Sequence, residues 1–160
     1  MKKNYLIKFS ATVGLMTGFL YFLLMGILGK KWLGYSWMSQ HMSELGGVES
    51  PYKNMMNIFG FMGVGVMIMM FSLGLYLNFK KNLILKLASF SIMLAGLFMV
   101  IVGFFPCDAH CVDVTLIGKL HTITSIPQSI LLPLGVIVAA IGFGKEKKWG
   151  KKWQTISIIL

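Results

Sequence analysis

Four apolar windows without a charged residue constrain this chain more than any other feature of its sequence. The windows are residues 9–29, 54–79, 87–107 and 120–144. A helix needs about 20 apolar residues to cross the hydrocarbon core of a bilayer, and each window is long enough. One such window would fit a buried helix of a soluble protein, but four in 160 residues would not. The sequence therefore predicts an all-α, polytopic transmembrane helical bundle.

The predicted spans lie within these windows, and residues 1–160 are expected to form a single transmembrane domain. The expected bounds of the spans are about 9–29, 55–79, 87–106 and 120–143. A further apolar segment, residues 153–160, is too short to cross a membrane. It predicts the start of a fifth helix or a tail that lies in the interface.

The lysines give the orientation. The chain has fifteen lysines, no arginine and five acidic residues, with a formal net charge of +10. So few charges on a chain that is 56% hydrophobic exclude a soluble, nucleic-acid-binding domain. If the N-terminus is inside, only four lysines lie in outer loops: Lys30, Lys31, Lys53 and Lys119. The positive-inside rule therefore predicts a multi-pass plasma-membrane protein with a cytoplasmic N-terminus.

The first outer loop, residues 30–54, is long enough to contain a short helix on the membrane surface. Ser36 can cap a helix that begins at Trp37, and Gly46-Gly47 can end it. His41 and Glu44 are three positions apart, so they would share one side of this helix.

The rare titratable residues gather on the predicted outer side. All three histidines and four of the five acidic residues lie there. They are His41, His110, His121, Glu44, Glu49, Asp108 and Asp113. Any chemical site is therefore expected to open outward.

The second outer loop contains both cysteines of the chain, four positions apart. Cys107 and Cys111 can form a disulfide in an oxidising compartment. The alternative is metal binding, because Asp108 and His110 lie between the two thiols.

A polar stripe marks the start of the fourth span. His121, Ser125 and Gln128 have the spacing i, i+4, i+7 and therefore share one helical face. Such a stripe faces the bundle interior or a polar cavity, since lipid cannot satisfy its hydrogen bonds. Ser125 and Gln128 are thus candidate substrate-binding residues. The alternative role is hydrogen bonding between helices.

Three elements of the sequence are similar to the membrane "domain of unknown function 998" family. They are SELG at residues 43–46, GFFPCD at residues 103–108, and His121 at the start of the fourth span. The resemblance covers essentially the whole chain. It implies a bacterial or archaeal helical bundle, usually of about six spans. It carries no established activity and draws attention to five residues: Ser43, Glu44, Pro106, Asp108 and His121.

The function expected from the sequence is that of an integral membrane protein with an outward-facing polar cluster of His41, Glu44, Asp108 and His121. This cluster would bind a lipid headgroup or a small solute, or support a partner protein. The oligomeric state is left open.

Two alternatives remain at this point. One is an intramembrane hydrolase acting on a lipid or amide at the outer leaflet, with His121, Asp108, Ser43 and Glu44 as catalytic candidates. In its metal-dependent form, the candidate ligands His41, Asp108, His110 and His121 would hold a zinc ion that activates water. The other is a transporter, against which stands the lack of charged residues at mid-membrane depth.

Overall fold

Four long helices dominate the part of the chain that the structure describes. The computed structural model describes residues 2–79 and 81–146, which include no strand. Their bounds are α1 Lys2–Lys31, α3 Val64–Asn78, α4 Leu83–Val102 and α5 Leu116–Gly144. The short α2 (Lys53–Met55) and the π-helical η2 (Met56–Gly63) extend α3 into one helix, Lys53–Asn78. Each long helix is apolar enough to cross a membrane, which confirms the predicted helical bundle.

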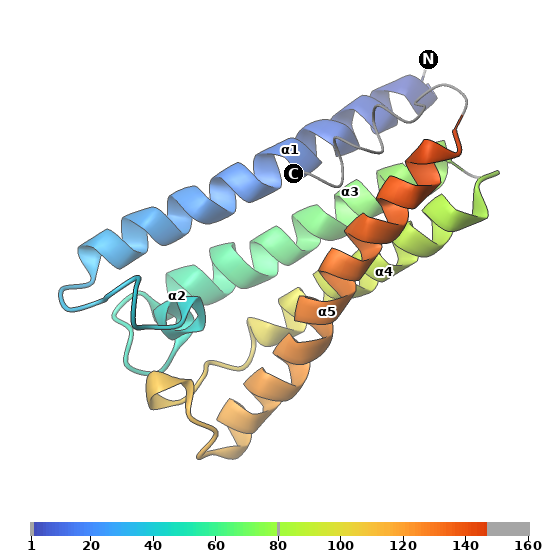
Figure 1. The fold of residues 1–160 in the computed structure, drawn as a ribbon. Coiled ribbons are helices and arrows are strands. Elements are labelled where there is room, and N and C mark those ends of the chain that lie inside the picture. Colours follow the sequence, from blue (N-terminus) through green and yellow to red (C-terminus); the bar gives the residue numbers. More distant parts are fainter. Residues whose placement is uncertain (1, 80, 147–160) are drawn as a thin grey trace.

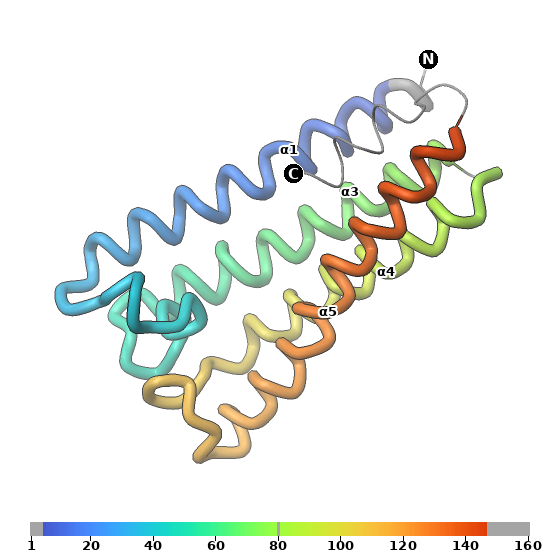
Figure 2. Tube along the Cα trace, in the orientation of Figure 1, coloured from blue at the N-terminus to red at the C-terminus, as the bar shows by residue number. Residues whose placement is uncertain are grey.

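The helices pack in chain order. α1 packs against α3, α3 against α4, and α4 against α5. The ribbon and the tube both show the connections 32–52 and 103–115 at one end of the bundle, which we call the loop end (Figures 1 and 2). The α3–α4 turn and the C-terminal end of α5 lie at the opposite end (Figure 1).

Glycines set the close contact between α3 and α4. A Cβ on Gly65 would lie 2.6 Å from the carbonyl oxygen of Gly96, and a Cβ on Gly96 would lie 2.8 Å from that of Gly65. The two backbones therefore meet directly, as small residues allow in membrane helices. Further along the same interface, the buried hydroxyl of Ser72 donates to the carbonyl oxygen of Ser89.

At the opposite end, Asn82 joins three elements. Its side-chain oxygen accepts from the N–H of Leu85, at 3.2 Å, and so caps the N-terminus of α4. Its side-chain nitrogen donates to the carbonyl oxygen of Gly142 and to the carboxylate of Glu146. The α3–α4 turn is thus attached to the end of α5.

The predicted short helix in the first loop is present, but its predicted start at Trp37 is wrong. The helix, η1, is a 3₁₀ helix spanning Met42–Gly46. The N–H of Ser36 donates to the side-chain oxygen of Gln40 at 2.8 Å, which closes a separate turn. The carboxylate of Glu44 then accepts from the N–H of His41 at 2.9 Å and stabilises a new helix start.

α4 and α5 begin before their predicted spans, whereas α4 ends at Val102, before its predicted end at residue 106. α4 begins at Leu83 and α5 at Leu116, because Asn82 and Thr115 cap them. The apolar windows began after Lys86 and Lys119, and these lysines in fact lie in the first turn of α4 and of α5. Residues 153–160 lie outside the described part of the chain, so a fifth helix stays a prediction.

Candidate functional site

Asp108 is fixed by the start of α5. Its carboxylate accepts from the N–H of Thr115 at 2.6 Å, from the Thr115 hydroxyl at 2.7 Å, and from the N–H of Val114 at 3.0 Å. The Thr115 hydroxyl oxygen in turn accepts from the N–H of Gly118 at 3.1 Å and caps the helix. Asp108 is buried, at 8% exposure, and it organises the backbone around it.

These hydrogen bonds change the acidity of Asp108. The backbone N–H and hydroxyl of Thr115 hold the pKa of this carboxyl below its ordinary value of 3.8, and the N–H of Val114 adds to the effect. Desolvation of the carboxylate by burial acts in the opposite direction and raises the pKa. Hydrogen bonds to a carboxylate favour the charged form, so Asp108 is ionised at neutral pH.

His121 packs inside the bundle near the loop end. It is 3% exposed, and its ring lies edge-on to Phe61 at a centroid distance of 6.3 Å. Its Nδ1 lies 2.6 Å from the carbonyl oxygen of Phe105. Because a carbonyl only accepts, Nδ1 carries the proton, and Nε2 has no hydrogen-bond partner among the described residues. His121 therefore attaches α5 to the end of α4.

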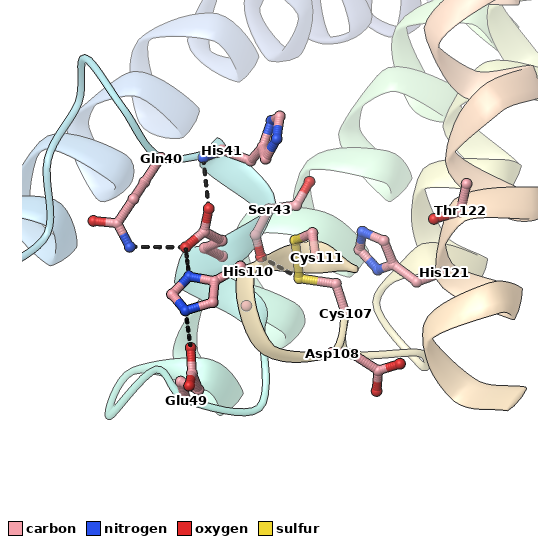
Figure 3. The surroundings of a disulfide bond; sticks show 12 residues. Gln40, His41, Ser43, Glu49, Cys107, Asp108, His110, Cys111, His121 and Thr122 are labelled. Atoms are coloured by element: carbon pink, nitrogen blue, oxygen red, sulfur yellow. Dashed lines mark hydrogen bonds and ion pairs between the residues drawn. A yellow bond between two sulfur atoms is a disulfide. The ribbon is translucent and has the colours of Figure 1, made fainter. Parts of the chain in front are cut away.

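Glu44 is also engaged by its neighbours. It is 5% exposed and accepts from the side-chain nitrogen of Gln40 at 2.7 Å as well as from the N–H of His41. His110 lies between two carboxylates, with Nδ1 3.8 Å from Glu44 and Nε2 4.0 Å from Glu49 (Figure 3). The ring of His110 is 74% exposed, so this contact lies at the surface of the loop end.

Cys107 and Cys111 form a disulfide across the 3₁₀ turn η3 (Ala109–Cys111). His110 and Cys111 have φ angles of 54° and 53°, in the left-handed region that L-residues adopt at a cost. The disulfide and this turn place His110 near Glu44 and Glu49. The disulfide closes a small loop within the α4–α5 connection, and His110 contacts the first loop from it.

The structure does not bring the candidate metal ligands together. Within residues 2–79 and 81–146, no three His, Cys, Asp or Glu side chains are placed to hold a metal ion. His41 is exposed on the first loop, whereas Asp108 and His121 are buried with separate partners. Figure 3 shows the Asp108 carboxylate and the His121 ring directed to different sides of the connection. The structure thus does not direct the side chains of these candidate ligands toward one point.

Below the loop end, α1 and α5 border a cavity of about 500 Å³ that is partly open. Ser125 and Gln128, the candidate binding residues, both line it, and so does the candidate catalytic Ser43 of η1. The remaining polar lining residues are Thr17, Tyr21 and Ser129. The rest of the wall is apolar and includes Phe22, Phe61, Ile68 and Leu132.

Most hydroxyl groups in this cavity already donate their hydrogen to their own helix. Thr17 donates to the carbonyl oxygen of Val13 at 2.7 Å, Ser125 to that of Thr122 at 3.0 Å, and Ser129 to that of Ser125 at 2.9 Å. Their lone pairs stay available as acceptors. The amide nitrogen of Gln128 and the Tyr21 hydroxyl donate to no described residue. The cavity therefore offers acceptors and free donors together.

Sequence reasoning missed part of this site. Thr17 and Tyr21 lie four positions apart on α1 and share one helical face, which the helix packing places on the same cavity as the polar face of α5. Tyr21 gave one signal, because it is the single tyrosine or tryptophan in the middle of a predicted span. Asn57 was also missed: it is 7% exposed and donates to the carbonyl oxygen of Gly46 at 3.0 Å.

Comparison with known proteins decides the family. A family model described as "Protein of unknown function (DUF998)" matches residues 15–160. The chain belongs to this family. No curated protein and no solved structure gives a significant match.

The three sequence elements that resemble DUF998 meet at the loop end. SELG forms most of η1, GFFPCD leads from the end of α4 into η3, and His121 lies in the second turn of α5. The N–H of Val48 donates to the carbonyl oxygen of Cys107 at 3.0 Å, and Cys107 Sγ lies 3.5 Å from the carbonyl oxygen of Ser43. With the His121–Phe105 bond, these contacts close the DUF998 loop end over the cavity.

Proposed function

We propose that this DUF998 protein holds an amphiphilic molecule, taken from the bilayer, in the cavity between α1 and α5. The observation that carries the proposal is the composition of the cavity wall, where the polar side chains of α5 face a largely apolar remainder. A lipid offers the same combination of a polar head and an apolar chain.

The size of the cavity supports a ligand rather than a few solvent molecules. Its volume of about 500 Å³ falls within the range of small-molecule sites, roughly 300–1,000 Å³. It would hold a headgroup and the first part of a chain. The cavity is partly open, so the rest of the chain would extend into the surrounding lipid.

The polar residues of the loop end support a scaffold role in this proposal. Asp108 is saturated by Val114 and Thr115, and Glu44 by Gln40 and His41. The hydrolase and transporter alternatives draw no comparable support from the geometry, and they stay untested hypotheses. In this proposal, Asp108, His121 and Glu44 shape the roof of the cavity and do not act on the ligand.

We further propose that the loop end faces the outside of the cell and that the N-terminus is cytoplasmic. The lysine distribution supports this orientation through the positive-inside rule. The disulfide supports it as well, because such bonds persist in oxidising compartments. The ligand would then enter from the outer leaflet.

A pair of glycines on α1 tests the ligand proposal. Gly18 lines the cavity and Gly26 does not, and a Cβ on either residue would meet no other atom within 4 Å. Gly18→Leu therefore fills the cavity, whereas Gly26→Leu is a matched control on the same helix. Lipid extracted from purified protein and quantified by mass spectrometry should fall for Gly18→Leu only. Equal lipid content in both variants would reject the proposal.

A further inference from the structure

We infer that the ligand of the α1–α5 cavity is a lipid with an uncharged head that carries both a hydroxyl and a carbonyl group, of which diacylglycerol is the simplest example. This inference rests on the proposed function and specifies its ligand class. The argument uses the charge and the hydrogen-bonding state of the cavity wall.

Within residues 2–79 and 81–146, the wall of the cavity contains no charged side chain. None of the residues that line it is Lys, Arg, His, Asp or Glu. A phosphate in this cavity would lose its hydration without gaining a counter-ion, which is strongly unfavourable. Recognition of a phosphate uses arginine, lysine or the N-terminus of a helix. The lining therefore favours a neutral head over a phospholipid head.

The nearest acidic side chain does not change this charge balance. Glu44 follows the lining residue Ser43 in η1, but its carboxylate binds Gln40 and the N–H of His41 outside the lining. The ring of His110 also lies near this carboxylate, on the surface of the loop end. A cationic head placed in the cavity would therefore find no carboxylate among the described residues of the wall.

The hydrogen bonds that the wall can still form match a hydroxyl and an ester together. Ser125 and Ser129 donate to their own helix and offer only acceptor lone pairs, which suit a ligand hydroxyl. The amide nitrogen of Gln128 and the hydroxyl of Tyr21 have no partner among the described residues, and they suit a ligand carbonyl. A head with both groups satisfies both sets of side chains, whereas a plain hydrocarbon satisfies neither.

The test uses photoreactive diacylglycerol and photoreactive phosphatidylglycerol, each in phosphatidylcholine vesicles that contain the full chain. Crosslinking to the wild-type protein is compared with crosslinking to Gln128→Leu and to Thr124→Val. Gln128→Leu keeps the shape of the wall and removes one of its free donors, the amide nitrogen of Gln128. Thr124→Val is the matched control, because Thr124 lies one turn earlier on α5, outside the lining, and bonds only its own helix.

We expect diacylglycerol to crosslink to the wild-type protein and to Thr124→Val alike, and about tenfold less to Gln128→Leu, the effect of one or two lost hydrogen bonds. Phosphatidylglycerol should crosslink weakly and without dependence on Gln128. Stronger crosslinking of phosphatidylglycerol that is lost in Gln128→Leu would overturn the neutral-head inference and leave the proposed function standing. If the two lipids crosslink equally to the wild type, to Gln128→Leu and to Gly18→Leu, the neutral-head inference and the proposed function are both overturned.

Discussion

Asp108 and Thr115 bind each other through two hydrogen bonds, one from the backbone N–H and one from the hydroxyl of Thr115, at 2.6 and 2.7 Å. This pair joins the α4–α5 connection to the first turn of α5 and leaves the carboxylate without a free oxygen. It explains why an aspartate at the membrane boundary is compatible with a structural role. It also makes the stability of the fold depend on pH.

We predict that Asp108→Asn lowers the Tm at neutral pH and removes part of the acid sensitivity. Because hydrogen bonds hold the folded pKa below 3.8, the ionised carboxylate stabilises the fold fully above that pH. The contribution is lost as the pH falls below about 3.8 and passes the folded pKa. The Tm difference between wild type and Asp108→Asn should therefore shrink at acidic pH. A difference that is constant with pH would contradict this account.

Gly118→Ala should also lower the Tm, because a Cβ on Gly118 would collide with the carboxylate of Asp108. The carboxylate would move, and its hydrogen bonds from Thr115 would weaken. The control is Gly26→Ala, which places a methyl group in open space. The double variant Gly118→Ala/Asp108→Asn should cost less than the sum of its parts, since both changes disturb one interaction. Strict additivity in thermal unfolding would show that the two residues are not coupled.

Removal of the disulfide should loosen the loop end. Replacement of Cys107 and Cys111 by serine should reduce the free energy of unfolding by about 2 kcal/mol, the chain-entropy effect of a small closed loop. The measurement is unfolding of detergent-solubilised protein with and without a reducing agent. Reduction should lower the stability of the wild type to that of the double variant and leave the variant unchanged. An unchanged wild type would mean that the bond contributes nothing.

The α3–α4 contact should be sensitive to a single methyl group. Gly65→Ala forces a Cβ against the carbonyl oxygen of Gly96 and the N–H of Val100. Overpacking of this kind costs about 1–3 kcal/mol, so we expect a clear fall in Tm. Gly26→Ala is again the control, and equal stability of the two variants would refute the close approach of these helices.

The sequence predicts the bundle well because a bilayer leaves few solutions to an apolar chain. Each apolar window had to become a helix, because a helix forms all its backbone hydrogen bonds within one segment, as the hydrocarbon core requires. The helix ends were less predictable. Lys86 and Lys119 bounded the windows, but a lysine is compatible with a first helical turn, and the true starts depend on the caps Asn82 and Thr115.

Of the residues that line the cavity, sequence analysis singled out the polar residues of α5 but not those of α1. The spacing of Ser125 and Gln128 on one helix indicated a polar face, and both residues line the cavity. Thr17 and Tyr21 have the same i, i+4 spacing on α1, but which way that face points depends on where α1 packs. The candidate metal ligands His41, Asp108, His110 and His121 illustrate the same limit. They share a side of the sequence-derived topology, yet Asp108 and His121 are bound by separate backbone partners.

The most direct test of the account locates a bound lipid along the chain. Photoreactive diacylglycerol, crosslinked to the protein in vesicles, is mapped by peptide mass spectrometry. The account predicts that labels concentrate on the cavity wall, at residues 17–22 of α1 and 125–132 of α5, and disappear there in Gly18→Leu. Labels spread evenly over outward-facing residues such as Leu15 and Phe90, with no enrichment at the wall, would contradict it.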